Sequence, residues 1–218
     1  MDRIAVKLGV WSAISVAVLV LLIDVGMIAS EMLYPLTSIT SIDAYATSFT
    51  SWQMLPFVPS FVLAPTFIVF MLCLYYYASE DAKILGQLSL IFATICGAIL
   101  SLHYYIQLTI VQQGLLNNQT NGLWMLAAPN PHSLFWSLAA LGYGFMGFAL
   151  LSAASLFKGQ YQRIIQVLFI ANGFLGTAFL VGNVLGIFIV DIFVSFAWGI
   201  LFPIAMLLVA KNFKTNSS

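Results

Sequence analysis

The stretch 167-VLFIANGFLGTAFLVGNVLGIFIVDIFVSFAWGILFPIAMLLVA-210 decides the fold, because it is apolar almost throughout and is interrupted mainly by two Asn and one Asp. A hydrocarbon core about 30 Å thick is crossed by roughly 20 helical residues. As one helix, at about 1.5 Å per residue, this stretch would span two bilayers. We therefore predict two membrane helices, Ile164–Leu185 and Ile192–Ala210, with a hairpin turn near Gly186–Asp191.

Four further apolar runs have the length of a membrane helix: Leu8–Ser30, Met54–Tyr77, Ile84–Gln107 and Ser133–Phe157. The composition agrees, with 62% hydrophobic residues, 6% charged residues and a mean hydropathy of +1.03, whereas soluble domains are about a quarter charged. The runs are continuous rather than alternating, and an open sheet would leave unpaired backbone in lipid. We predict an all-α, multi-pass membrane protein whose residues 1–218 form a single six-helix domain.

The first run resembles the start of a secretory signal, since basic residues precede it. It is nevertheless long, contains Asp24 and lacks a clear small-x-small cleavage site before Glu31. We expect it to be retained as a membrane helix.

The seven basic residues all fall on one side of the predicted membrane: Arg3, Lys7, Lys83, Lys158, Arg163, Lys211 and Lys214. Cytoplasmic segments are enriched in Lys and Arg, so we predict that both termini are cytoplasmic (N-in/C-in). The segments predicted outside contain only acids: Glu31, Asp43 and Asp191. Seven acidic residues balance the basic ones and no basic block occurs, which argues against nucleic acid as a partner.

Small residues predict how two of the helices pack. The fourth helix carries one stripe and the fifth another at small-xxx-small spacing: Ala140, Gly144, Gly147 and Ala154, and Ala178, Gly182 and Gly186. Such stripes let helix backbones approach closely in lipid, so we expect these two helices to touch. Asn172, near the middle of the fifth helix, is expected to bond to a neighbouring helix.

Polar residues gather at one level near the outer edge of the membrane. His103 lies about 28 Å along the third helix, Asp24 lies about 25 Å from Lys7, and Asn183 reaches a similar height. Gln107 shares the His103 face. An ionised Asp24 with no cation nearby must find donors, reach water or be protonated. The predicted ligand-binding residues are Asp24, His103, Tyr104, Gln107 and Asn183.

Two simpler explanations account for the same residues. Asp24 at the membrane interface can be hydrated by water, and His103 and Gln107 can belong to an interfacial belt with the outer Trp residues. The outer segments are 31–53 and 113–132. In the first, Ile39 and Ile42 begin an apolar face at helical spacing, which indicates either a short interfacial helix or an irregular loop.

Known chemical motifs are absent from the sequence. It has no phosphate-binding Gly-Lys loop, no His-Glu-x-x-His helix and no Gly-x-Ser-x-Gly elbow. His103 and His132 have no thiolate nearby, because Cys73 and Cys96 are predicted at other depths. We expect no metal, no cofactor and no disulfide.

Three functions remain as hypotheses. The first is a bundle in the lipid bilayer that binds, senses or passes a small molecule or lipid through an outward-facing polar pocket. The second is a membrane enzyme acting on a lipid or isoprenoid at the outer leaflet, with His103 as general acid or base and Asp24 orienting it. The third is an assembly subunit that uses its glycine stripes to bind a membrane-protein partner or a second copy of itself.

The paired segments 137-SLAALGYGFMGFALLSAASLF-157 and 163-RIIQVLFIANGFLGTAFLVG-182, joined by a short basic turn, carry one resemblance. The chain resembles small six-helix bacterial membrane proteins of unknown function in its general layout. The resemblance implies a bacterial inner (plasma) membrane. It supplies no activity and no functional residues.

Overall fold

The computed structural model describes residues 3–33, 35, 39–158 and 162–215. Six helices in this part are long and apolar enough to cross a membrane, as predicted. The elements are α1 (Arg3–Leu33), α2 (Ile42–Ser48), η2 (Ser51–Met54), α3 (Phe57–Tyr77), η3 (Glu80–Ala82), α4 (Lys83–Ile106), η4 (Gln107–Val111), α5 (Gln112–Leu116), η5 (Leu123–Met125), α6 (Leu134–Ala154), α7 (Arg163–Leu185) and α8 (Phe188–Thr215).

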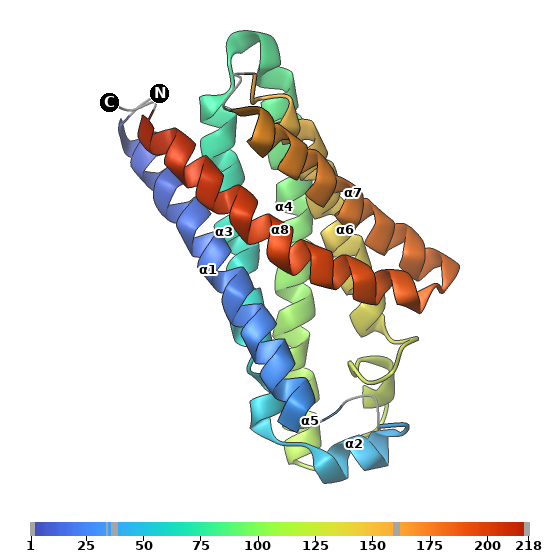
Figure 1. The fold of residues 1–218 in the computed structure, drawn as a ribbon. Helices are drawn as coiled ribbons and strands as arrows, with labels where there is room; N and C mark the ends of the chain where they lie inside the picture. The colour runs from blue at the N-terminus through green and yellow to red at the C-terminus, as the bar shows by residue number, and fades with distance from the viewer. Residues whose placement is uncertain (1–2, 34, 36–38, 159–161, 216–218) are drawn as a thin grey trace.

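The six long helices pack as a closed ring (Figure 1). The main contacts follow the chain from α1 to α3, α4, α6, α7 and α8, and α8 then packs against α1. Buried apolar side chains from the ring fill its centre, among them Phe67, Met146 and Phe202. The contact between α1 and α8 therefore joins the first and last parts of the sequence and brings both termini to one end.

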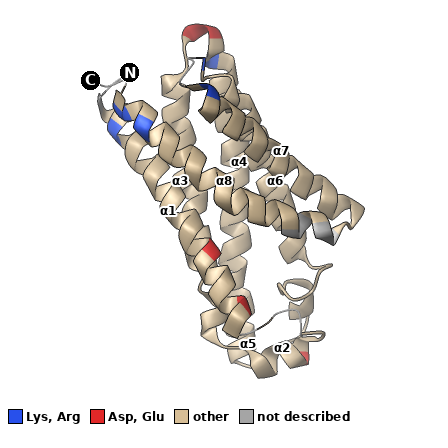
Figure 2. Ribbon diagram, in the orientation of Figure 1, with Lys and Arg blue, Asp and Glu red and all other residues tan. Residues whose placement is uncertain are grey.

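Figure 2 shows Lys and Arg gathered at the end of the bundle where both chain termini lie, which we call the basic end. We call the opposite end the distal end. Glu80 also lies at the basic end and pairs with Lys83 at 3.9 Å. The side chains of Arg3 and Asp191 lie outside the described part of the structure. The arrangement confirms that the described basic side chains gather at one end of the bundle. That this end faces the cytoplasm stays a prediction from the enrichment of Lys and Arg in cytoplasmic segments.

Two boundaries differ from the prediction. The third membrane helix continues beyond Gln107, because the π-helical turn η4 joins α4 to α5 and extends the rod to Leu116. The α7–α8 turn is shorter than expected: Gly186 adopts φ 69°, and α8 begins at Phe188. A left-handed residue at this position is tolerated because glycine has no Cβ.

The short helix α2 confirms the helical interpretation of the first outer segment. The Ser41 side chain caps it by accepting a hydrogen bond from the Ala44 backbone N–H at 3.2 Å. Tyr45 is buried, and its ring lies edge-on to Phe49 with 5.8 Å between centroids. The segment therefore folds onto the bundle rather than lying only in the headgroups.

Helices α6 and α7 touch through glycine, as predicted for the fourth and fifth membrane helices. A Cβ at Gly147 would lie 2.6 Å from the Gly173 carbonyl oxygen, and one at Gly176 would lie 2.5 Å from the Tyr143 carbonyl oxygen. On α6 the contact uses Gly147 of the predicted stripe, whereas on α7 the close approaches at Gly173 and Gly176 lie outside the predicted stripe of Ala178, Gly182 and Gly186.

The basic end is held by a polar cluster around Tyr77 of α3. The Tyr77 hydroxyl accepts hydrogen bonds from Gln162 Nε2 at 2.7 Å and Asn212 Nδ2 at 3.2 Å. Gln162 precedes α7 and Asn212 lies on α8, so one phenol joins three parts of the bundle. Phe213 packs edge-on to the same ring at 5.5 Å.

Replacing Gly147 by Leu is expected to destabilise the bundle. The new side chain would meet the α7 backbone, which cannot rotate away, so we expect a loss of roughly 1–3 kcal/mol of unfolding free energy or more. The measurement is denaturant or thermal unfolding in detergent micelles. Ala98→Leu, which adds the same side chain on the exposed face of α4, is the matched control. Equal stability of the two variants would contradict the α6–α7 contact.

Candidate functional site

His103 and Gln107 lie one helical turn apart on the inner face of the α4 rod. Their side chains are 1% and 2% exposed. The His103 ring contacts Phe135 of α6 at 4.6 Å and Tyr104 at 4.5 Å between centroids. This burial does not fit an interfacial belt, whose side chains face the headgroups. The pair belongs to the interior of the distal half.

Each of these two buried side chains has a polar atom without a partner. His103 Nε2 and Gln107 Oε1 form no hydrogen bond with any described residue. Gln107 Nε2 donates to the Leu126 carbonyl at 2.9 Å, so its amide is only half satisfied. An unmet buried polar group costs about 1–3 kcal/mol. Gln107 also opens the π-helical turn η4, a feature frequent at functional sites.

Residues 117–133, which we call the distal cap, connect α5 to α6 and fold against the bundle. Three side chains hold its backbone: Gln107 Nε2 on Leu126 O, Asn130 Nδ2 on Trp124 O at 2.9 Å, and Trp136 Nε1 on Ala128 O at 3.0 Å. Leu123, Ala127 and Ala128 of the cap are buried in the core. The cap is therefore an ordered cover that bonds directly to a site residue.

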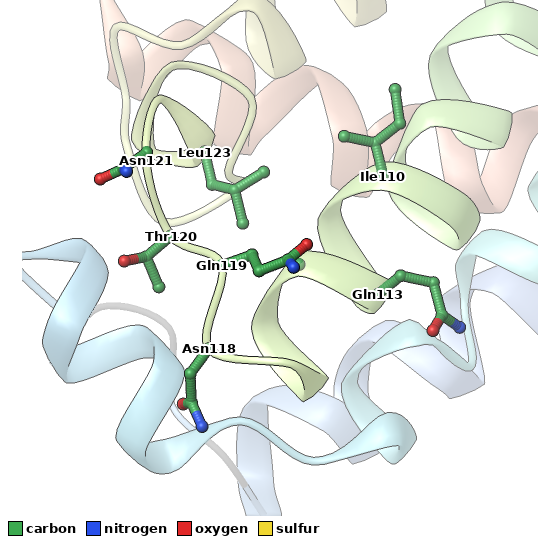
Figure 3. A pocket seen from close by; sticks show the side chains of 8 residues that line it. Ile110, Gln113, Asn118, Gln119, Thr120, Asn121 and Leu123 are labelled. Carbon is green, nitrogen blue, oxygen red and sulfur yellow. The ribbon is translucent and has the colours of Figure 1, made fainter.

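A hollow of about 700 Å³ lies beside the cap, farther along the rod than Gln107 (Figure 3). Amide and hydroxyl side chains predominate around it, and none of the lining residues is charged. The lining residues are Ile110, Gln113, Gly114, Asn118, Gln119, Thr120, Asn121 and Leu123. The distal surface thus offers uncharged hydrogen-bonding groups on the helix that carries His103.

Asp24 occupies a different place, at the seam where α1 packs against α8. Its half-buried carboxylate lies over Gly199, where a Cβ would come within 2.8 Å of both carboxylate oxygens. Within the described part of the chain no hydrogen bond or ion pair joins Asp24 to another side chain. Whether Asp24 and His103 meet could not be predicted from the sequence, and no hydrogen bond joins them among the described residues.

Two phenols lie beside His103. The Tyr104 and Tyr143 hydroxyls share a hydrogen bond of 2.8 Å between α4 and α6. The Tyr104 ring adjoins the His103 ring, with 4.5 Å between their centroids. The phenol pair therefore joins α4 to α6 next to His103.

The two Asn side chains of α7 make no hydrogen bond to another helix among the described residues. Asn183 is half-buried in the last turn of α7, where its backbone carbonyl accepts from Gly186 N–H at 3.2 Å, and no hydrogen bond joins its side chain to the described residues. The interhelical bond predicted for Asn172 was wrong: its Nδ2 donates to Leu168 O of the same helix at 2.8 Å. Asn172 Oδ1 is buried without a partner.

Sequence reasoning missed Tyr143, whose hydroxyl bonds Tyr104 next to His103. Tyr143 lies between two glycines in 142-GYG-144. A phenol inside an apolar helix usually needs a partner, which was the available signal for Tyr143. The described residues contain no group of three or more His, Cys, Asp or Glu able to hold a metal ion.

Comparisons of the chain with protein-family models, with curated proteins and with solved structures gave no match. No functional residue can therefore be carried over from a relative.

The Tyr104–Tyr143 bond predicts non-additive stability. Changing either Tyr to Phe leaves the other buried hydroxyl without this partner, which costs about 1–3 kcal/mol. The double variant loses both hydroxyls together and should cost less than the sum of the single variants, by roughly 0.5–1.5 kcal/mol. Unfolding free energies of the four proteins in one detergent give the coupling. Strict additivity would show that the two phenols do not interact.

Proposed function

We propose that this multi-pass membrane protein binds a small molecule or a lipid headgroup at its distal end, against His103 and Gln107 and beneath the distal cap. The single observation that carries the proposal is the pair of unpartnered atoms, His103 Nε2 and Gln107 Oε1, one turn apart in the buried interior. Buried polar groups are nearly always hydrogen-bonded in native proteins. A bound molecule supplies the missing partners.

The chemistry of the two atoms limits the ligand. Gln107 Oε1 accepts only, so the ligand presents a donor to it. Neutral His103 offers Nε2 as donor or acceptor, according to its tautomer. A hydroxyl satisfies either need, and a primary amide does so equally well. We infer a ligand that carries hydroxyl or amide groups.

The surface around the cap supports entry of the ligand from the distal side. The hollow of about 700 Å³ has Gln113 on the rod and Gln119 and Asn121 on the cap, all uncharged. If the predicted sidedness holds, this surface faces outward, and the resemblance in layout favours a bacterial inner membrane. Movement of the cap would release the Gln107–Leu126 bond, which couples entry of a ligand to one defined contact.

The two rival functions receive less support. An enzyme with His103 oriented by Asp24 requires a contact between the two side chains, and no hydrogen bond joins them. An assembly subunit that grips its partner through glycine stripes requires free stripes, whereas Gly147 is occupied by the α6–α7 contact. Ligand binding needs neither arrangement.

Replacing His103 by Phe distinguishes the effect of the unpartnered nitrogen on stability from its role in ligand binding. Phe removes the unpartnered nitrogen while keeping a planar ring, so the ligand-free variant should gain roughly 1–3 kcal/mol of unfolding free energy. The same variant should lose the molecule that the unaltered chain retains through gentle extraction. Stability is measured after delipidation, and the retained molecule is identified by mass spectrometry.

Tyr105→Phe is the matched control, because it removes one polar group from the exposed face of the same helix. It should change neither stability nor the retained molecule. Retention of an identical set of molecules by the His103→Phe variant and the unaltered chain would overturn the proposed function.

A further inference from the structure

The distal cap contains an Asn–Gly pair, Asn121 and Gly122, in an exposed turn. Asparagine is a thermally labile residue, because the backbone nitrogen of the next residue can attack its side-chain carbonyl carbon. A following glycine favours this attack, since it has no Cβ and its backbone adopts many conformations. The sequence contains one other such pair, Asn172 and Gly173, within α7. The surroundings of the two pairs differ in every respect that matters for the reaction.

The backbone around Asn121 leaves the attacking nitrogen free. Residues 120–123 form a turn in which Leu123 N–H donates to Thr120 O at 3.1 Å. Gly122 is the third residue of this turn, with φ 77° and ψ −8°, the values of a type II turn. Its N–H takes no part in the turn bond and donates to no residue that the structure describes. The nitrogen can therefore approach the Asn121 side chain without the loss of a hydrogen bond.

The Asn121 side chain is equally unrestrained. It is exposed, and no hydrogen bond joins it to the described part of the chain. It lines the hollow of about 700 Å³, and Figure 3 shows it on the cap, across the hollow from Ile110 of the rod. None of the lining residues carries a charge. Water therefore reaches the reacting groups, and a charge formed here would be the first in the wall of the hollow.

Two other asparagines each lack some of these conditions. Asn172 precedes Gly173, but it is 1% exposed and its Nδ2 donates to a backbone carbonyl of the same helix at 2.8 Å. Asn118 is exposed on the same cap, but the next backbone N–H, that of Gln119, donates to a carbonyl of α5 at 2.7 Å. Of these three asparagines, Asn121 alone combines exposure, a following glycine and a free backbone N–H.

We propose that Asn121 is a site of spontaneous deamidation, which converts it to aspartate or isoaspartate and places a negative charge in the wall of the hollow. The Gly122 nitrogen forms a bond to Asn121 Cγ, and the side-chain amide leaves as ammonia with the proton lost from Gly122. Water then opens the resulting succinimide ring. Cleavage of the new bond to Cγ gives aspartate, and cleavage of the original peptide bond gives isoaspartate.

Isoaspartate would also change the backbone of the cap. Its main chain runs through the former side chain, which adds one methylene group to the turn. The same turn leads into Leu123, whose side chain is buried in the core. The reaction needs only water and no ligand, so it is independent of the site proposed at His103 and Gln107.

The test incubates the full chain in detergent micelles, in mildly alkaline buffer made with water enriched in heavy oxygen. Digestion and mass spectrometry then locate each heavy oxygen atom that ring opening has introduced. Asn121 should be converted at least about tenfold faster than Asn118 or Asn172. Both aspartate and isoaspartate are expected, as two peptides of equal mass that separate by chromatography.

Asn121→Gln is the matched variant. It keeps the amide but lengthens the side chain, so attack would require a larger ring, and position 121 should stay unlabelled. Absence of conversion at Asn121 in the unaltered chain would overturn the proposal. Equal rates at Asn118, Asn121 and Asn172 would overturn it as well.

Peptides distinguish the effect of the fold from that of the sequence and do not depend on a variant. The chain is first cut with chymotrypsin, and the peptides are then incubated in the same water. The rates at Asn121 and Asn172 should converge, because both residues precede glycine and neither is then held by the fold. A difference in the peptides as large as that in the folded chain would overturn the argument from the turn and from α7.

Discussion

A polar group buried in the hydrocarbon of a membrane has no water to bond, so the protein itself or a bound molecule must satisfy it. The two ends of this bundle meet that constraint differently. At the basic end, the Tyr77 hydroxyl accepts from Gln162 and Asn212 and ties three parts of the chain together. In the distal half, His103 Nε2 and Gln107 Oε1 have no hydrogen-bond partner among the described residues. The contrast separates an end whose polar cluster is paired within the protein from a half in which two buried polar atoms are not.

The ring topology explains how the distal half acquires two distinct polar regions. Closure of the ring by α1 and α8 places Asp24 over Gly199, on a seam that borders lipid. In the continuous rod from α4 to α5, the His103 side chain faces the interior of the bundle. The later turns of the rod reach the distal cap. Tyr143 on α6 bonds to Tyr104, the neighbour of His103. The polar groups of the distal half therefore lie in two separate regions, with Asp24 at the α1–α8 seam and His103 inside the bundle.

Length, apolar content and the placement of Lys and Arg are local properties of the sequence, which is why the six membrane helices and the common side of both termini could be predicted. The shared face of His103 and Gln107 also followed from helical spacing. Which helices pack against each other is not a local property of the sequence. Pairing of α1 with α8 decides that Asp24 meets Gly199 rather than His103. Rotation of α7 about its axis decides that Gly173 and Gly176 make close approaches to α6. The spacing of small residues in the sequence determines neither which helices pair nor how a helix is rotated about its axis.

The most direct test of a distal ligand site is a crystal structure in a lipidic mesophase, from protein extracted gently from its own membrane. The account predicts density larger than water that contacts both His103 Nε2 and Gln107 Oε1 beneath the distal cap. Density for ordered water alone at these two atoms, or a rotated side chain that pairs them within the protein, would contradict it.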